Sequence, residues 1–512
     1  MPAGEVRLAD LLSSLSLAID LGLGLPMETM LRAALIAARL ADAAGCSVED
    51  AQAAYYLALL RFVGCTTTSH DDSVTFGGDE LAVGELVADD DDEFMPVVQR
   101  TIGANKPPAE AAAAIGRFFE AFASGGIAAH HRMHCEAAVL MARRFGLGEA
   151  VVTGLADIYE RWDGRGTVRQ AAGEALSLPL RIAQVGMLAA FKAGSQDAAA
   201  VAVTVAARGG RQLDPRLTAI FAESAGEIMA GIGNRPLAEA VRDAEPGDKR
   251  LLRGDGIDRG LGVVADFGDL KSPHMLGHSR RVADIAERAA TASGMKGGDV
   301  ALVRRAGLVH DVGRVGLQAQ LLSKGGALSP AEHERIRLHT YLTERVFAAS
   351  DVLRPVGAIG AMHHERLDAS GYHRGLAGPT IPPAARLLAA ANAWCALTEA
   401  RPHRQTMTEA EASRALMGLG KSGQLDPRAV DAVLTAAGQK PAHSRRSSGI
   451  GLSEREIEVL RLVAGQQSNK AIALTLGISP KTVERHVTHI YDKLGVTTRA
   501  GVALYATENG LI

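Results

Sequence analysis

The amino-acid sequence predicts an all-α protein. Aromatic residues make up only 4% of the 512 residues, alanine is abundant, and few segments alternate apolar and polar residues as strands do. Apolar residues recur instead at helical spacing, as Leu31, Leu35 and Leu40 do. Because 47% of the residues are hydrophobic, the chain can bury sizeable cores, and we do not expect global disorder.

Charge and cysteine usage narrow the functional classes. The formal net charge of −3 gives no global basic field, so any nucleic-acid site must be local. The cysteines are scattered without a CxxC pair, which argues against structural zinc and a disulfide framework and is typical of a reducing cytoplasm. No uninterrupted apolar run approaches the ~18 residues that a membrane span needs, and the N-terminus lacks a signal-peptide pattern. We expect a cytoplasmic protein with no membrane partner.

Changes of pattern along the chain suggest domain boundaries. Helical patterning occupies most of residues 1–240, interrupted by an acidic run that is most simply a solvated loop or helix start. Gly, Pro, Asp and Arg break the pattern over residues 241–262, which we interpret as a linker. Residues 263–438 form a second helical domain. Residues 439–450 read as a flexible linker, and residues 451–512 as a small C-terminal domain.

Histidines gather in the second domain. Seven candidate metal ligands lie in or beside four predicted helices: His274, His278, His310, Asp311, His339, His363 and His364. Helices that point imidazoles inward can build a metal site, and imidazoles with a carboxylate suit Fe or Mn. Two such ions can share an aspartate, activate a water and hold a phosphate during in-line attack. The alternative for the His310-Asp311 pair alone is a helix end bonded to nearby backbone.

The first half of the chain repeats the second at low similarity. The pentapeptide that begins at Gln212 recurs at Gln424, and His134 precedes Asp163 by the same interval as His339 precedes Asp368. Of the candidate ligands, the first copy keeps only His134. The positions of His278, His310, Asp311, His363, His364 and Asn392 are taken there by Thr29, Arg61, Phe62, Ile158, Tyr159 and Met187. We interpret the first copy as a scaffold, dimerisation or sensing domain, because one ligand cannot hold an ion tightly.

From Ser272 to Ala437 the sequence resembles the HD-GYP branch of the HD-superfamily phosphohydrolases. The motifs that carry the resemblance include HSRRV from His278, HDVGR from His310 and HHERLDASGYHRGL from His363. The resemblance implies a helical fold, two or three metal ions, and hydrolysis of cyclic di-GMP. The implied metal ligands are His278, His310, Asp311, His339, His363, His364 and, at the position of a late aspartate, Asn392. The first copy is then a degenerate HD-like domain.

The same resemblance gives the residues that act on substrate, and three departures from the family pattern. Asp311 and Arg314 are the implied catalytic residues, and those implied to bind substrate are Arg314, Arg281, Asp368, Gly371 and Tyr372. Arg314 replaces a lysine, His373 replaces the proline of GYP, and Asn392 replaces an aspartate. A neutral carbonyl oxygen holds a divalent cation more weakly than a carboxylate does, so turnover stays an open question.

The C-terminal domain carries a different pattern. Ser453 and Ser479 precede amphipathic segments, and Gly477 lies in a turn between two predicted helices, as in major-groove readers. Residues 451–512 resemble the LuxR-type helix-turn-helix domain, which has four helices. The residues implied to face DNA are Lys481, Thr482, Arg485 and His486, with phosphate contacts from Lys470 and Lys493. An inert three-helix bundle is the alternative.

Together these patterns predict a DNA-binding transcriptional regulator with tandem HD-type domains. The final helix, residues 499–508, is where the LuxR family often pairs, so we expect a homodimer on double-stranded DNA. Three roles for the HD domains stay open. They hydrolyse cyclic di-GMP or a related phosphodiester, they sense a nucleotide or metal without turnover, or they mainly scaffold a dimer.

Overall fold

Helices form nearly all the regular structure, as the sequence predicts. The computed structural model describes residues 4–75, 106–402, 404–439, 452–464 and 467–494, with Val98, Ile102, Val496 and Val502. The chain divides into two compact units, Met1–Gln439 and Lys440–Ile512, called unit 1 and unit 2 below. No helix within these described ranges has the length and apolar character to span a membrane. The acidic run at 89–93 lies outside the described residues, as does the predicted final helix apart from Val502.

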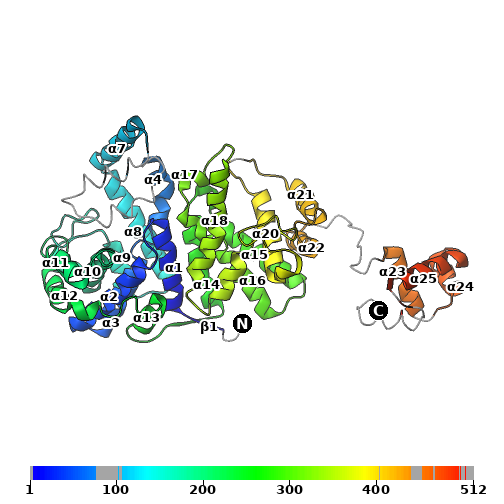
Figure 1. Ribbon diagram of the computed structural model, residues 1–512, viewed down its shortest axis with the longest axis horizontal. Helices are drawn as coiled ribbons and strands as arrows, with labels where there is room; N and C mark the ends of the chain where they lie inside the picture. The colour runs from blue at the N-terminus through cyan, green and yellow to red at the C-terminus, as the bar shows by residue number, and fades with distance from the viewer. Residues whose placement is uncertain are drawn as a thin grey trace. The chain divides into compact units, whose positions relative to one another are not determined.

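Unit 1 contains two sets of helices, one after the other along the chain (Figure 1). Each set begins with a short strand and three α-helices, followed by a 3-10 helix and further helices; the second set has an additional short 3-10 helix after its first α-helix. The first set, with 3-10 helices marked η, comprises β1 (Glu5–Arg7), α1 (Leu8–Gly22), α2 (Thr29–Ala43), α3 (Val48–Leu60), η1 (Cys65–Thr68), α4 (Ser69–Thr75), α7 (Pro108–Ala123), α8 (Gly126–Arg144), α9 (Glu149–Ala156), η4 (Gly173–Ala175), α10 (Leu178–Ala193), α11 (Ala198–Ala206), α12 (Pro215–Ile228) and α13 (Leu237–Asp243). The second set comprises β2 (Leu251–Arg253), α14 (Asp255–Asp269), η5 (Pro273–Met275), α15 (His278–Ala292), α16 (Gly297–Val309), η6 (Val312–Gly316), α17 (Ala319–Leu322), α18 (Pro330–Phe347), α19 (Arg354–Gly360), η7 (Gly378–Thr380), α20 (Pro383–Thr398), α21 (Glu409–Lys421) and α22 (Pro427–Ala436).

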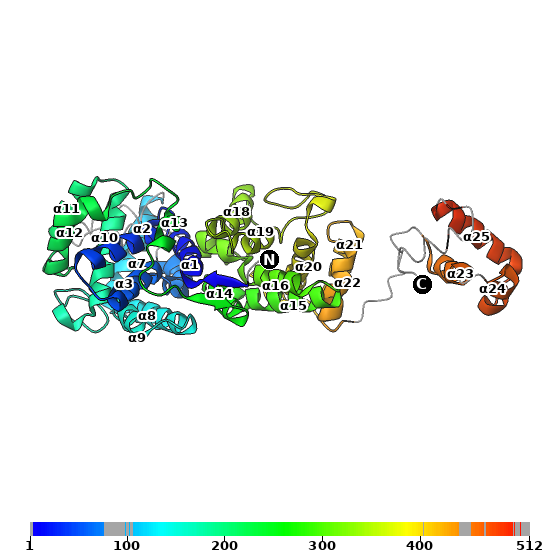
Figure 2. The same cartoon turned by 90° about the horizontal axis from the view of Figure 1, so that it is seen from below.

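The two sets of unit 1 are joined by strands and by helix packing. β1 and β2 pair antiparallel, with Glu5 opposite Arg253. Helix α1 packs on α2 and α3 of its own set and also on η6 and α18 of the second set (Figure 2). The segment interpreted as a linker, residues 241–262, therefore contains β2 and the start of α14. The domain boundary there stays a prediction.

Glycine allows the same close approach in each set. A Cβ atom on Gly64, before η1, would collide with the carbonyl oxygen of His134 on α8. A Cβ atom on Gly313, in η6, would collide with the carbonyl oxygen of His339 on α18. The two sets thus share a packing contact. In each, a histidine lies against the turn that follows α3 or α16.

A buried aspartate fixes where the second helix of each set begins. The carboxylate of Asp269 accepts hydrogen bonds from the backbone N (3.0 Å) and hydroxyl (2.7 Å) of Ser279. Gly277 adopts a left-handed φ of 73°, so the chain turns and His278 becomes the first residue of α15. In the first set the backbone N of Met30, the second residue of α2, donates to Oδ1 of Asp20 (3.3 Å).

Unit 1 has two main apolar clusters, besides a small third one that contains Ala114 and Phe118. The larger draws residues from both helix sets, including Leu35 and Phe221 of the first and Phe267 and Val312 of the second. The smaller lies between α15, α16, α20 and α22 around residues such as Leu388. Burial of apolar surface in a shared cluster explains why the two sets form one unit.

Unit 2 contains three described helices, α23 (Glu454–Ala464), α24 (Asn469–Leu476) and α25 (Pro480–Leu494). Serine hydroxyls accept hydrogen bonds from the first turns, as Ser468 does at α24 (3.2 Å) and Ser479 at α25 (3.1 Å). Gly477 ends α24 with a left-handed φ of 63°. These observations confirm the predicted helix, turn and helix; the fourth helix lies outside the described residues.

Candidate metal centre and DNA-binding surface

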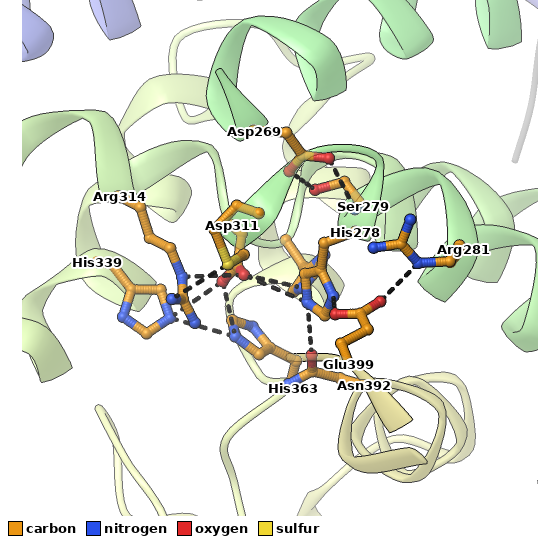
Figure 3. A network of polar contacts seen from close by, with 12 residues as sticks. Asp269, His278, Ser279, Arg281, Asp311, Arg314, His339, His363, Asn392 and Glu399 are labelled. Carbon is orange, nitrogen blue, oxygen red and sulfur yellow. Dashed lines mark hydrogen bonds and ion pairs between the residues drawn. The ribbon is translucent and has the colours of Figure 1, made fainter. Parts of the chain in front are cut away.

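Asp311 lies among four buried histidines, in the turn between α16 and η6 (Figure 3). Its Oδ2 atom lies 3.3 Å from Nε2 of His310 and 3.6 Å from Nε2 of His278. Its Oδ1 atom lies 3.3 Å from Nε2 of His339 and 3.3 Å from Nε2 of His363. Each carboxylate oxygen therefore faces two imidazoles.

Backbone hydrogen bonds orient three of these imidazoles. In each case Nδ1 donates to the carbonyl oxygen three residues earlier: His310 to Gly307 (2.8 Å), His339 to Ile336 (2.6 Å) and His363 to Gly360 (2.7 Å). A neutral ring that donates through Nδ1 presents a lone pair at Nε2. These lone pairs and the Asp311 carboxylate lie at about hydrogen-bond distance with no hydrogen between them, so they repel one another. A cation bound among them would remove this repulsion, and the donor set therefore fits a metal ion.

The remaining predicted ligands complete the cluster. Asn392, buried on α20, places Oδ1 3.1 Å from Nε2 of His278. His364 stacks on Tyr372 with ring centroids 4.6 Å apart, and its buried Nε2 makes no hydrogen bond within the described chain. Ligand atoms of His339, His363 and His364 lie within 4.8 Å of one another, as do those of His278, His310 and Asp311. The structure thus brings together the seven ligands that the resemblance implies, whereas His274 lines the cavity described below; their coordination of metal stays a prediction.

Asp311, His278 and His363 have charge states that suit metal binding. Burial favours a raised pKa for Asp311, but Arg314, 2.9 Å from its Oδ2, and His310 outweigh burial and hold that pKa well below its usual range. Burial lowers the pKa of His278 to about 4 and that of His363 to about 3. Burial alone would lower the pKa of His310, but the nearby Asp311 carboxylate outweighs burial and raises that pKa. Near neutral pH the carboxylate is charged, and His278 and His363 are uncharged, as metal ligands must be.

A cavity of about 760 Å³ lies beside the cluster. Arg314, Tyr372, His364 and Asn392 form the wall toward the histidines. The other cationic or imidazole side chains that line it are His274, Lys324, His333, Arg401 and Arg404. None of the described lining residues is Asp or Glu, so the cavity suits an anionic ligand.

The structure separates the five predicted substrate-binding residues. Arg314 and Tyr372 line the cavity, whereas the other three are not among its lining residues. Nε of Arg281 lies 2.6 Å from Glu399, and exposed Asp368 accepts hydrogen bonds from Ser370 within its own turn. A Cβ atom on Gly371 would collide with backbone of residues 364–366, so this glycine permits a tight loop.

Sequence reasoning missed four charged residues near the site. Arg401 and Arg404 line the cavity from the turn after α20, and Lys324 lines it from the segment after α17. Glu399 lies against His278, with Oε2 2.7 Å from Nδ1. A signal was present, since charged residues recur from 399 to 404 directly after an apolar helix, but the sequence alone does not show which way such a turn folds.

The described residues of the first helix set form no equivalent cluster. His134 is the retained ligand, but its Nε2 lies 2.6 Å from the hydroxyl of Thr68 and its Nδ1 lies 2.9 Å from that of Tyr159. The guanidinium of Arg61, at the position of His310, donates to the carbonyl of Ile158 (2.8 Å). Among the described residues, the groups able to hold a metal ion lie in the second set.

The predicted DNA-facing residues lie on α24 and α25 of unit 2. Three are exposed, Lys470, Lys481 and Arg485, and two are half-buried, Thr482 and His486. Lys493 differs, because its ammonium lies 2.8 Å from the carboxylate of Glu456 on α23. The buried side chains of α25, Val483, Val487 and Ile490, lie on its other face.

Two known families match this chain, one within unit 1 and one within unit 2. Residues 262–429 match the family described as HD domain, and residues 451–506 match the family described as bacterial regulatory proteins of the luxR family. The chain carries an HD domain followed by a LuxR-type DNA-binding domain. The resemblances found in the sequence are thereby confirmed.

Relatives of the HD domain include phosphodiesterases of cyclic dinucleotides. The chain is 26% identical over 414 residues to 3'3'-cGAMP-specific phosphodiesterase 3 of Vibrio cholerae, covering 78% of this chain and 88% of that protein. It is 32% identical over 177 residues to a cyclic di-GMP phosphodiesterase of Thermotoga maritima, covering 34% and 47%. A crystal structure of a V. cholerae cyclic GMP-AMP-specific phosphodiesterase has a similar fold, with a TM-score of 0.58, 23% identity, and coverage of 85% of this chain and 98% of that chain.

Proposed function

We propose that the protein is a transcriptional regulator whose HD domain is a metal-dependent phosphodiesterase of a cyclic dinucleotide. The observation that carries the proposal is the Asp311 carboxylate, which faces four imidazoles beside a cationic cavity free of described carboxylates. The relatives named above act on 3'3'-cGAMP or cyclic di-GMP, and these are the candidate substrates. The proposed domains are residues 1–240, 263–438 and 451–512.

The donor set supports two divalent ions, with Fe or Mn as the candidates. His278, His310 and Asn392 would hold one ion, and His339, His363 and His364 the other, with Asp311 shared between them. Bound ions of this kind lower the pKa of a water molecule and polarise phosphoryl oxygens.

The chain's own residues would bind the substrate and stabilise its charge. A cyclic dinucleotide carries two phosphodiester anions, and the guanidinium groups of Arg314, Arg401 and Arg404 line the cavity that would receive them. We propose Asp311 and Arg314 as catalytic residues. Arg314 would offset charge that develops on the reacting phosphate, as a fixed cation in a partly dry site can.

A second function is favoured by one residue. Asn392 places a neutral amide where a carboxylate would hold an ion more strongly. In this alternative, the HD domain binds metal and nucleotide without turnover, or scaffolds a dimer, and its occupancy changes DNA binding. The partner in both cases is double-stranded DNA, which we propose is bound by a homodimer in the cytoplasm.

The two functions are separated by one experiment on the full chain loaded with Mn²⁺. The protein is incubated with 3'3'-cGAMP or cyclic di-GMP, binding is measured by calorimetry, and products are separated by chromatography. Cleavage by the wild type supports the phosphodiesterase. Binding without cleavage, together with cleavage by Asn392→Asp, supports the sensor. If neither protein binds a nucleotide, both proposals fail and the scaffold remains.

A further inference from the structure

We propose that Glu399 is a positioning residue that orients His278 for metal binding. The inference rests on the proposed metal centre and concerns a residue that no family motif in the sequence singled out. Glu399 immediately follows α20, the helix that carries Asn392. These two residues flank the His278 ring, with Oε2 of Glu399 2.7 Å from Nδ1 and Oδ1 of Asn392 3.1 Å from Nε2.

The position of His278 in its helix explains why a carboxylate is needed. His310, His339 and His363 each donate from Nδ1 to the carbonyl three residues earlier. His278 is the first residue of α15 and follows Gly277, whose left-handed φ of 73° turns the chain away from helical geometry. Within the described chain no backbone carbonyl accepts from its Nδ1, and Glu399 supplies the acceptor instead.

The short contact also decides which ring nitrogen carries the proton. A carboxylate oxygen accepts only, so a separation of 2.7 Å from Nδ1 requires a hydrogen on that nitrogen. A guanidinium nitrogen of Arg401 lies farther from Nδ1, at 3.3 Å, and it also lies 3.1 Å from Glu399. With Nδ1 protonated, the neutral ring presents its Nε2 lone pair toward Asp311.

Two arginines hold the Glu399 carboxylate in place, one of which, Arg281, is labelled in Figure 3. Oε1 lies 2.6 Å from Nε of Arg281, and Oε2 lies 3.1 Å from Arg401. The Glu399 side chain is only 11% exposed, so water competes little for it. A carboxylate that accepts from the far nitrogen of a metal-binding histidine fixes the ring and raises its basicity. Glu399 thus restores negative charge beside a site whose own late ligand, Asn392, is neutral.

The test is the affinity of the full chain for Mn²⁺, measured by calorimetry. We expect Glu399→Ala to lower the affinity by about 10- to 100-fold, the usual effect of losing such a partner. Glu399→Gln keeps an oxygen acceptor and should recover part of the loss. The matched control is Asp284→Ala, which removes an exposed carboxylate of the same helix α15 that pairs with Arg304 (2.8 Å) and should bind Mn²⁺ as the wild type does.

The ¹⁵N spectrum of histidine-labelled, metal-free protein gives a second readout. The wild type should show His278 protonated at Nδ1, and Glu399→Ala should lose that preference. Equal Mn²⁺ affinities of Glu399→Ala and the wild type would overturn the inference. If Glu399→Ala does not fold, an affinity of Glu399→Gln equal to that of the wild type overturns it. A wild type that binds no Mn²⁺ would instead overturn the proposed metal centre.

Discussion

At the scale of single residues, the site depends on opposite charges held in a buried space. Asp311 is only 2% exposed and has Arg314 as its cationic partner at 2.9 Å. Four imidazoles face the same carboxylate. Burial favours the neutral forms of His278, His339 and His363 and makes them costly to protonate, whereas Asp311 raises the pKa of His310.

This desolvation predicts a pH dependence of stability. His278 and His363 have pKa values of about 4 and about 3 in the folded protein, below the ordinary value of 6.5. At pH values between about 4 and 6.5, these two histidines bind more protons in the unfolded chain than in the folded one. The free energy of unfolding of metal-free protein should therefore fall as pH drops from 6.5 toward 4. Denaturant titrations should show a shallower fall for a His278→Asn, His363→Asn double variant; equal slopes would contradict the prediction.

The cavity predicts a residue-level effect on nucleotide binding. Arg401 contributes a guanidinium group to a lining that contains no described carboxylate. Arg401→Met keeps much of the side-chain volume but removes the charge, so affinity for 3'3'-cGAMP should fall by about tenfold or more. Calorimetry should show no such loss for Arg288→Met, an exposed arginine on α15 that is not a lining residue. Equal losses in both variants would show that the cavity arginine has no special role.

At the scale of elements, the packing of η6 on α18 positions both Asp311 and His339. Gly313→Ala should lower the free energy of unfolding by more than about 2 kcal/mol, because the new Cβ would overlap the His339 carbonyl and neighbouring backbone. Gly298→Ala, where no atom lies within 4 Å of the added Cβ, is the matched control and should be neutral or stabilising. Similar chemical-denaturation midpoints for both variants would refute this account of η6.

The charges on helix α25 predict a graded effect on DNA binding. Lys481 is exposed, whereas Lys493 is paired with Glu456. Lys481→Ala should weaken binding to a random-sequence duplex and lower the salt slope of the binding constant by about 1. Lys493→Ala should change the slope less, because its ammonium is already neutralised by Glu456. The reverse order in fluorescence-anisotropy titrations would contradict the assignment.

The sequence predicts helices more readily than contacts between them. The start of α25 follows from the local Ser479 cap and its inward face from apolar spacing, and motif residues such as His278 and Asp311 come together as expected. The pairing of β1 with β2 was not predicted, because three-residue strands far apart in the chain carry little pattern. Glu399 was missed for a related reason, since its role depends on how the turn after α20 folds back onto α15.

At the scale of the whole molecule, the chain joins an HD domain to a LuxR-type DNA-binding domain. If nucleotide binding regulates DNA binding, linkage requires the two affinities to change by the same factor. We therefore expect saturating 3'3'-cGAMP to change the affinity for duplex DNA, and DNA to change the nucleotide affinity equally. Nucleotide binding that leaves DNA affinity unaltered would exclude regulation through occupancy.

In the proposed metal centre, Asp311 would be shared by two metal ions of the HD domain. The most direct measurement is the metal content of the full chain after loading with Mn²⁺ and desalting. The account predicts two ions per chain for the wild type, near-complete loss of both in Asp311→Ala, because each oxygen faces a different pair of histidines, and no loss in Asp284→Ala. A wild type without manganese, or an Asp311→Ala variant that retains the wild-type content, would contradict it.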